Sequence, residues 1–167
     1  MEERDVIEVL DLLEAAGVDA VLDGGWGIDA LLGAQTRPHG DLDLAIATES
    51  VDAARAALEE RGFVHDDEAR PGSPARIVMR DAAGRAVDLH PVQLDEDGNG
   101  WQDLGGGAWG LYTTAGLSGN GVVGGRSVRC ISPELQLRHH LGWPWSEHDR
   151  ADMERLAARF GVQLPPE

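Results

Sequence analysis

Acidic side chains recur at alternate positions in two short stretches of the chain. Asp41 and Asp43 alternate with leucines, and Asp88 and His90 repeat the pattern farther along. Successive side chains of a β-strand point to opposite faces, so each pair shares one face while its apolar neighbours take the other. If the two strands are neighbours in a sheet, three carboxylates and one imidazole converge on a single patch.

Clustered carboxylates repel one another, which raises their pKa values unless a cation lies between them. Oxygen ligands of this kind suit Mg²⁺, which takes one or two protein carboxylates together with substrate phosphates. The pattern therefore predicts a magnesium site at Asp41, Asp43 and Asp88 that serves phosphate chemistry. A single Asp-x-Asp is more often an exposed strand face, so the prediction depends on the second strand.

The second strand also offers two candidates for a general base. Asp88 would either complete the metal site or accept the proton of an attacking hydroxyl group. His90 is the alternative base, because the unperturbed pKa of histidine is about 6.5. His90 has a second interpretation, in which its imidazole only orients the site through hydrogen bonds. The residues by themselves leave both candidates open.

A glycine-rich turn, Asp-Gly-Gly-Trp-Gly at residues 23–27, connects a predicted strand to a predicted helix. Gly24 and Gly25 would let the backbone approach a phosphate, and the start of the helix would supply unpaired N–H groups and partial positive charge. These two glycines and Trp26 are candidate nucleotide-binding residues. On its own, a Gly-Gly pair before a helix is more often a tight turn.

The basic residues limit which side chains could contact a polyphosphate. All 14 of them are arginines, against 30 aspartates and glutamates, and the formal net charge is −16. A cationic side chain on a triphosphate must therefore be an arginine or a protonated histidine, and the candidates are Arg37, His39 and Arg76. Arg37 and His39 could equally be surface turn residues.

The composition also excludes several classes of partner. So acidic a chain is not expected to bind nucleic acid or an anionic membrane surface. No apolar run approaches the ~20 residues of a membrane span, and the first residues lack the pattern of a signal peptide. The single cysteine, Cys130, fits a reducing compartment and a core position, so we expect a cytoplasmic protein. The acidity favours a cationic or metal-bridged ligand.

Apolar periodicity and turn residues predict a mixed α/β unit followed by two C-terminal helices. Helices are expected at 6–16, 26–32, 51–61, 133–141 and 146–160, and strands at 18–22, 41–47, 75–80, 85–92 and 127–131. The strands 75–80 and 85–92 should form a hairpin. Ser50, Ser132 and Ser146 are the expected N-caps of the last three helices.

The segment 97–125 has a different character. Eleven of the 22 glycines fall within it, which predicts a long irregular loop, either functional or a mobile insertion. We expect one compact domain, with a core over residues 1–126 and a C-terminal helical extension over 127–167. His139 and His140 are interpreted as structural, because adjacent helix positions point about 100° apart. Trp143 and Trp145 would line a pocket or pack the helical corner.

Taken together, these motifs resemble those of the antibiotic nucleotidyltransferases. The likeness is greatest to the small lincosamide nucleotidyltransferases, and the aminoglycoside nucleotidyltransferases are more distant. It spans nearly the whole chain, through residues 21–33, 37–44, 87–92, 97–100, 128–132, 136–142 and 149–152. The segments 105–125 and 142–145 depart from the family pattern.

The resemblance implies an α+β, polymerase-β-like nucleotidyltransferase fold, in which a mixed sheet is flanked by helices and followed by a small C-terminal helical part. The acidic pair of the family falls on Asp41 and Asp43, its third carboxylate on Asp88, and its Gly-Gly turn on Gly24 and Gly25. Because Asp88 holds the place of that third carboxylate, the resemblance favours Asp88 over His90 as the base. The implied cofactors are one or two Mg²⁺ ions, with ATP or another nucleoside triphosphate as co-substrate. The implied reaction transfers a nucleoside monophosphate, most simply AMP, to a drug hydroxyl and releases pyrophosphate.

The acceptor stays open at this point. A small, cationic, hydroxylated antibiotic is expected, a lincosamide before an aminoglycoside, and another hydroxylated metabolite is the alternative. A non-catalytic nucleotide-binding or antitoxin-like module is a third possibility, which the retention of all three carboxylates disfavours. The resemblance also suggests a homodimer whose C-terminal helices help to complete the site.

Overall fold

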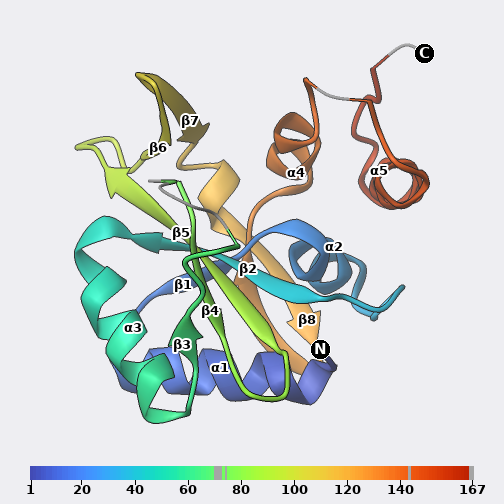
Figure 1. The fold of residues 1–167 in the computed structure, drawn as a ribbon. Helices are drawn as coiled ribbons and strands as arrows, with labels where there is room; N and C mark the ends of the chain where they lie inside the picture. Colours follow the sequence, from blue (N-terminus) through green and yellow to red (C-terminus); the bar gives the residue numbers. More distant parts are fainter. Residues whose placement is uncertain (70–72, 74, 143, 166–167) are drawn as a thin grey trace.

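The computed structural model describes residues 1–69, 73, 75–142 and 144–165, and it contains a mixed sheet covered by helices (Figure 1). Its strands are β1 (Ala20–Leu22), β2 (Asp41–Ala47), β3 (Val64–His65), β4 (Ile77–Arg80), β5 (Ala86–Leu94), β6 (Gly100–Gly105), β7 (Ala108–Tyr112), β8 (Gly119–Val123) and β9 (Arg126–Cys130). Its helices are α1 (Glu3–Ala15), α2 (Gly24–Leu32), α3 (Val51–Glu60), α4 (Pro133–His139) and α5 (Glu147–Phe160), with 3-10 turns at Thr48–Ser50 and Gly116–Ser118. None of the described helices combines the length and the hydropathy that a membrane crossing requires.

The sheet brings the two acidic strands together at its centre. The strand order is β3-β4-β5-β2-β1-β9-β8, and β2 runs parallel to β5 while β4 and β5 form the predicted antiparallel hairpin. The far end of β5 pairs with β6, which pairs with β7, so that a two-stranded ribbon extends from the sheet (Figure 1). The two acidic strands were required to be neighbours for their carboxylates to converge, and the pairing of β2 with β5 confirms that they are.

Helices α1 and α3 cover one face of these central strands (Figure 1). Val6 and Leu13 from α1 and Leu58 from α3 are buried in one cluster with Leu44 and Leu89 from the two strands. Because the leucines of β2 and β5 face this core, the intervening aspartates are left on the opposite side of the sheet. The alternation predicted from the sequence is therefore what positions the polar patch.

Capping residues set most helix ends, with small differences from the predictions. Asp23 caps α2 by accepting from the Gly24 N–H at 2.7 Å, so α2 starts at Gly24 and the Gly-Gly pair forms its first turn. Ser132 and Ser146 cap α4 and α5 as predicted. Ser50 also stands at the predicted N-cap position of α3, but its side chain makes no capping hydrogen bond, because a 3-10 turn runs directly into the helix. Helix α4 ends at His139, two residues earlier than expected.

The last helix packs across α2. Met153 and Leu156 of α5 are fully buried against Ile28 of α2, and Val162 closes the cluster. Burial of each such side chain stabilises the fold by roughly 1.5–3 kcal/mol. Phe160, at the end of the helix, stays 42% exposed. Helix α5 is thus held to the rest of the molecule mainly by apolar contacts.

The glycine-rich segment 97–125 is not an irregular loop, and this prediction was wrong. It forms β6, β7 and β8, and its glycines serve tight turns and close packing. Gly105, Gly106 and Gly107 take positive φ values in the turn between β6 and β7, which suits residues without a Cβ. At Gly121 a Cβ would collide with the backbone of Ala30, so the glycine allows α2 to lie close against β8. The glycine content was interpreted as a sign of an irregular loop, but in the structure these glycines allow tight turns and close packing.

Candidate active site

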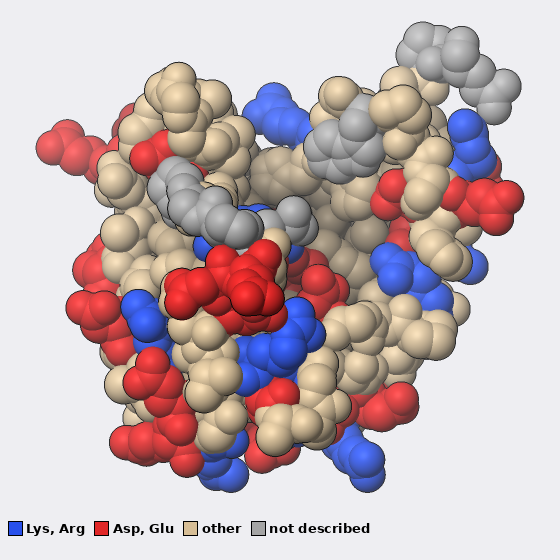
Figure 2. Space-filling model, in the orientation of Figure 1, with Lys and Arg blue, Asp and Glu red and all other residues tan. Residues whose placement is uncertain are grey.

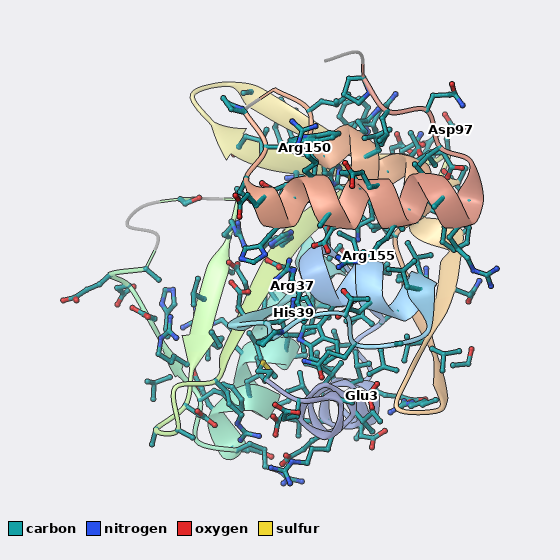
Figure 3. The ribbon with its side chains drawn as sticks, turned by 90° about the vertical axis from the view of Figure 1, so that its right-hand side faces the viewer. Glu3, Arg37, His39, Asp97, Arg150 and Arg155 are labelled. Carbon is teal, nitrogen blue, oxygen red and sulfur yellow. The ribbon has the colours of Figure 1, made fainter. Side chains whose placement is uncertain are left out.

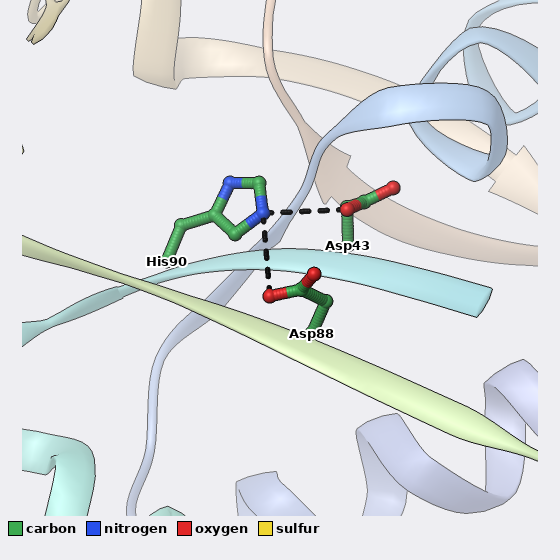
Figure 4. A group of neighbouring side chains, drawn as sticks. All are labelled: Asp43, Asp88 and His90. Atoms are coloured by element: carbon green, nitrogen blue, oxygen red, sulfur yellow. Dashed lines mark ion pairs between the residues drawn. The ribbon is translucent and has the colours of Figure 1, made fainter. Parts of the chain in front are cut away.

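The acidic patch is built on paired positions of the two parallel strands. Asp43 of β2 and Asp88 of β5 are partners in the strand register, and His90 lies two residues beyond Asp88 on the same face (Figure 4). The His90 Nε2 atom is 3.3 Å from Asp43 Oδ1 and 3.8 Å from Asp88 Oδ1. One potential ligand atom from each of the three residues lies within 4.8 Å of the others. Asp41 stands at the first position of β2, in register with Ala86.

Arg76, just before β4, supplies positive charge to this patch. Its Nη2 atom lies 2.6 Å from Asp43 Oδ1 and 2.5 Å from Asp88 Oδ2. This bridging contact was not foreseen from the sequence, which indicated Arg76 only as a triphosphate contact. Asp41 receives less compensation, and burial together with the charges of Asp43 and Asp88 raises its pKa above the usual value.

Behind the carboxylates lies a buried hydrogen-bond network. The Tyr112 hydroxyl donates to Asp23 Oδ2 at 2.8 Å and lies 3.2 Å from His90 Nδ1. His139 of α4 completes it, with its Nδ1 atom 3.6 Å from Asp23 Oδ2 and its ring against the Tyr112 ring at 4.5 Å. The network ties the cap of α2, the ribbon, β5 and α4 to one another.

The network fixes the charge of its buried members. Burial alone would lower the pKa of His90, but hydrogen bonds to Asp23 and Asp43 raise it to about 9. Burial would likewise raise the pKa of Asp23, yet hydrogen bonds to His139 and His90 hold it well below the usual range. At neutral pH His90 is therefore an imidazolium beside the ionised carboxylate of Asp23.

Three members of this network were missed by sequence reasoning. Tyr112 falls in the segment interpreted as a loop, His139 was interpreted as structural, and Asp23 was noted only as the residue before the glycines. No local pattern marks any of them, because each acquires its partner from a distant part of the chain.

The first turn of α2 lies directly against the patch. Gly24 has φ +57°, and a Cβ there would collide with the carboxylate of Asp43. The Gly24 carbonyl accepts a hydrogen bond from Gln136 Nε2 of α4 at 3.2 Å, and Gln136 also fills the space that a Cβ on Gly27 would need. The glycines therefore let the start of α2 approach both the acidic strand and α4.

Arg37 and His39 lie beside the same turn. A Cβ on Gly25 would collide with the imidazole of His39 and would come within 3.0 Å of Arg37 Nη2. His39 is buried, and its Nε2 atom lies 2.5 Å from Asp29 Oδ2. Trp26, in the first turn of α2, is only 1% exposed and packs its ring against His39 at 4.9 Å, so its side chain is enclosed within the protein. His39 is therefore not a surface turn residue, and both side chains lie next to the first turn of α2.

A cavity of about 660 Å³ opens over the carboxylates. The β6–β7 ribbon lines one side with Gln102, Leu104 and Leu111, and α4 lines the other with Arg138 and His139. Figure 2 shows this face of the molecule hollowed between the ribbon and α4, with acidic side chains gathered below the hollow. The cavity is large enough for a ligand of drug size.

The sequence of this chain matches a family model described as aminoglycoside-2''-adenylyltransferase over residues 5–156. The chain belongs to this adenylyltransferase family. It is a nucleotidyltransferase, as the motifs predicted, and its α+β fold is confirmed.

Several relatives of this adenylyltransferase share most of its length. A lincosamide resistance protein of Staphylococcus haemolyticus is 31% identical over 157 residues, covering 92% of this chain and 93% of the relative. The crystal structure of the lincosamide antibiotic adenylyltransferase LnuA with lincomycin bound is 30% identical, has a TM-score of 0.82, and covers 95% of this chain and 98% of LnuA. The structure of ANT(2")-Ia with adenylyl-2"-tobramycin, at 20% identity and a TM-score of 0.70 over 93% of this chain and 87% of ANT(2")-Ia, shares the fold.

The donor set of this adenylyltransferase fits a hard divalent cation. Carboxylate oxygens are the ligands that Mg²⁺ prefers, and two of the three carboxylates are register partners on one face. Asp88 Oδ1 is buried without a hydrogen-bond partner among the described residues. Arg76 already holds a positive charge between Asp43 and Asp88, which shows that this position favours a cation.

The remaining residues discussed from the sequence fall outside the cavity or outside the described chain. Cys130 is fully buried in the core as predicted. Trp145 packs on the cluster between α2 and α5, and its Nε1 donates to the carbonyl of His140 at 2.7 Å. Trp143 lies outside the described residues.

Proposed function

We propose that this adenylyltransferase transfers AMP from ATP to a hydroxyl group of a lincosamide antibiotic and releases pyrophosphate. The observation that carries the proposal is identity of about 30% over nearly the full length to both a lincosamide resistance protein and a lincomycin-bound adenylyltransferase. ATP and the drug would meet in the cytoplasm. The carboxylate patch and the cavity above it supply the chemistry and the space that such a reaction needs.

Asp41 and Asp43 would hold Mg²⁺, with Asp88 beside them. When bound, the ion neutralises charge on the triphosphate and favours departure of pyrophosphate. The first turn of α2 would bind phosphate oxygens through backbone N–H groups, and Arg37 and His39 lie beside that turn to add side-chain donors. Arg76 would leave the carboxylates and turn to the triphosphate.

Asp88 is the general base in this proposal. His90 is the alternative, but in the protein without a metal ion a pKa of about 9 keeps its imidazole protonated at neutral pH, which favours Asp88 as the proton acceptor. Asp88 Oδ1 faces the site without a hydrogen-bond partner among the described residues, which leaves it a free acceptor. His90 then offsets the charge of Asp43 and Asp88, since its Nε2 atom lies 3.3 Å from Asp43 Oδ1 and 3.8 Å from Asp88 Oδ1.

The cavity wall supports a small acceptor with both apolar and cationic parts. Leu104 and Leu111 of the ribbon present apolar surface, and the acidic patch at the floor attracts a protonated amine. The family model favours an aminoglycoside as the second candidate acceptor, because the model is described by that reaction. We further propose a homodimer in which the C-terminal helices help to complete the site.

Incubation with Mg-ATP and separate acceptors tests the proposal directly. With lincomycin or clindamycin, ATP should release pyrophosphate and the drug should gain the mass of one AMP group, whereas neither change should occur with tobramycin or kanamycin. Modification of the aminoglycosides alone would replace the first acceptor class with the second. ATP binding without release of pyrophosphate in the presence of any of these acceptors would favour the non-catalytic module. Size-exclusion chromatography with light scattering tests the dimer, which a monomeric mass would refute.

A further inference from the structure

The guanidinium of Arg37 is held by the C-terminal helix. Arg37 lies in the connection between α2 and β2, and its Nε donates to Asp152 Oδ2 of α5 at 3.0 Å, across 115 positions of the sequence. The Asp152 side chain is only 3% exposed, while that of Arg37 is 28% exposed. In Figure 3, Arg37 and Arg155 lie in the zone between α5 and α2.

The orientation of this guanidinium follows from the way that Asp152 binds it. A guanidinium is a rigid planar fork, so fixing Nε fixes the direction of both terminal nitrogens. Nη1 donates to the Pro38 carbonyl at 3.4 Å, and Nη2 lies 3.0 Å from the position of a Cβ on Gly25. Within the described part of the chain, Nη2 has no hydrogen-bond acceptor. The contact with Asp152 therefore directs the two N–H groups of Nη2 toward the first turn of α2.

The ion pair is not what attaches α5 to the molecule. Met153 and Leu156 already bury apolar surface against α2, and a buried ion pair adds little net stability over apolar packing. The second oxygen of Asp152 accepts from Arg155 Nη1 at 3.0 Å, on a side chain that is 43% exposed. Asp152 thus has one partner directed to the α2 turn and one directed to solvent, which makes the two arginines a matched comparison.

We propose that Asp152 is a positioning residue for nucleotide binding, which holds Arg37 so that Nη2 donates to the triphosphate at the first turn of α2. The inference rests on the proposed function, because it requires a nucleoside triphosphate at that turn. Helix α5 would then contribute to nucleotide binding through Asp152, which contacts Arg37 and not the nucleotide itself.

Calorimetric titration with Mg-ATP in the absence of acceptor measures the effect without any turnover. Asp152→Asn should weaken ATP binding by about tenfold, as should Arg37→Gln, and the double variant should bind no more weakly than Arg37→Gln alone. Arg155→Gln, which removes the other partner of Asp152, should leave the affinity within about twofold. When AMP transfer to an acceptor is measured, Asp152→Asn should raise the KM for ATP by a larger factor than it lowers kcat.

Arg37→Lys provides a second test that does not depend on the stability of the Asp152 variants. It keeps the positive charge but loses the fork, so its ATP affinity should fall as it does in Arg37→Gln. Additive losses in the double variant, an equal loss in Arg155→Gln, or unchanged binding in Arg37→Lys would overturn the inference. Wild-type protein that fails to bind Mg-ATP would overturn the proposed function as well, whereas normal wild-type binding with unaffected variants overturns this inference alone.

Discussion

Asp43 and Asp88 stand directly opposite each other on the parallel strands β2 and β5. Neighbouring strands lie about 4.8 Å apart, so the two carboxylates are held side by side by the backbone itself. Their repulsion is offset by Arg76 on one side and by His90 on the other. The fold therefore maintains a concentrated negative charge that accepts a cation without rearranging the sheet.

Asp43→Asn should abolish AMP transfer while leaving the fold intact. The change removes one charge from the patch but keeps the shape of the side chain, so we expect turnover to fall by about 100-fold or more. Pyrophosphate release measures the loss, and circular dichroism checks the fold. Asp19→Asn is the control, because Asp19 is exposed and paired with Arg129 away from the cavity. Near-normal turnover of Asp43→Asn would contradict the assignment of the site.

Gly24→Ala and Gly33→Ala separate backbone strain from damage to the site. Both glycines have positive φ values, so each alanine should cost about 1–2 kcal/mol of unfolding free energy. A Cβ on Gly24 also collides with Asp43, whereas a Cβ on Gly33 meets nothing within 4 Å. Only Gly24→Ala should therefore lose Mg-ATP binding, as measured by calorimetry. Equal effects on nucleotide binding would mean that close approach of α2 to β2 is unimportant.

The stability of the metal-free protein should depend on pH through His90. Its pKa is raised from 6.5 to about 9 in the folded state, so its stabilising contribution is complete below about pH 6.5 and is lost as the pH rises through about 9. Urea unfolding in the presence of a chelator should show the advantage of wild-type protein over His90→Asn shrinking between pH 6 and pH 9.5. A constant difference across that range would exclude a protonated His90.

Cys130 should resist alkylation in the folded protein. Its thiol is fully buried, and burial raises its pKa to about 12, so almost none of the reactive thiolate forms at pH 8. Iodoacetamide should modify it only after denaturation, as measured by intact mass. Rapid labelling under native conditions would show that β9 opens readily.

The sequence was most informative where a pattern is local. The alternation around Asp41 and Asp43 predicted β2 at its observed bounds, and the caps at Ser132 and Ser146 predicted the starts of α4 and α5. A strand period or a capping hydrogen bond involves residues only a few positions apart, so it can be recognised without tertiary context. Local composition failed at 97–125, where glycines that serve tight turns and close packing were interpreted as a loop.

By itself, therefore, the sequence determined which residues have the chemistry: three carboxylates on strand faces, a glycine turn before a helix, and arginines as its basic side chains. The tertiary structure decided which of them meet. It placed β2 beside β5, brought Arg76 between their carboxylates, and carried Asp152 across 115 residues to Arg37. Contacts between distant segments follow from how the apolar faces of whole elements pack. No local sequence pattern at the few contacting residues therefore predicts them.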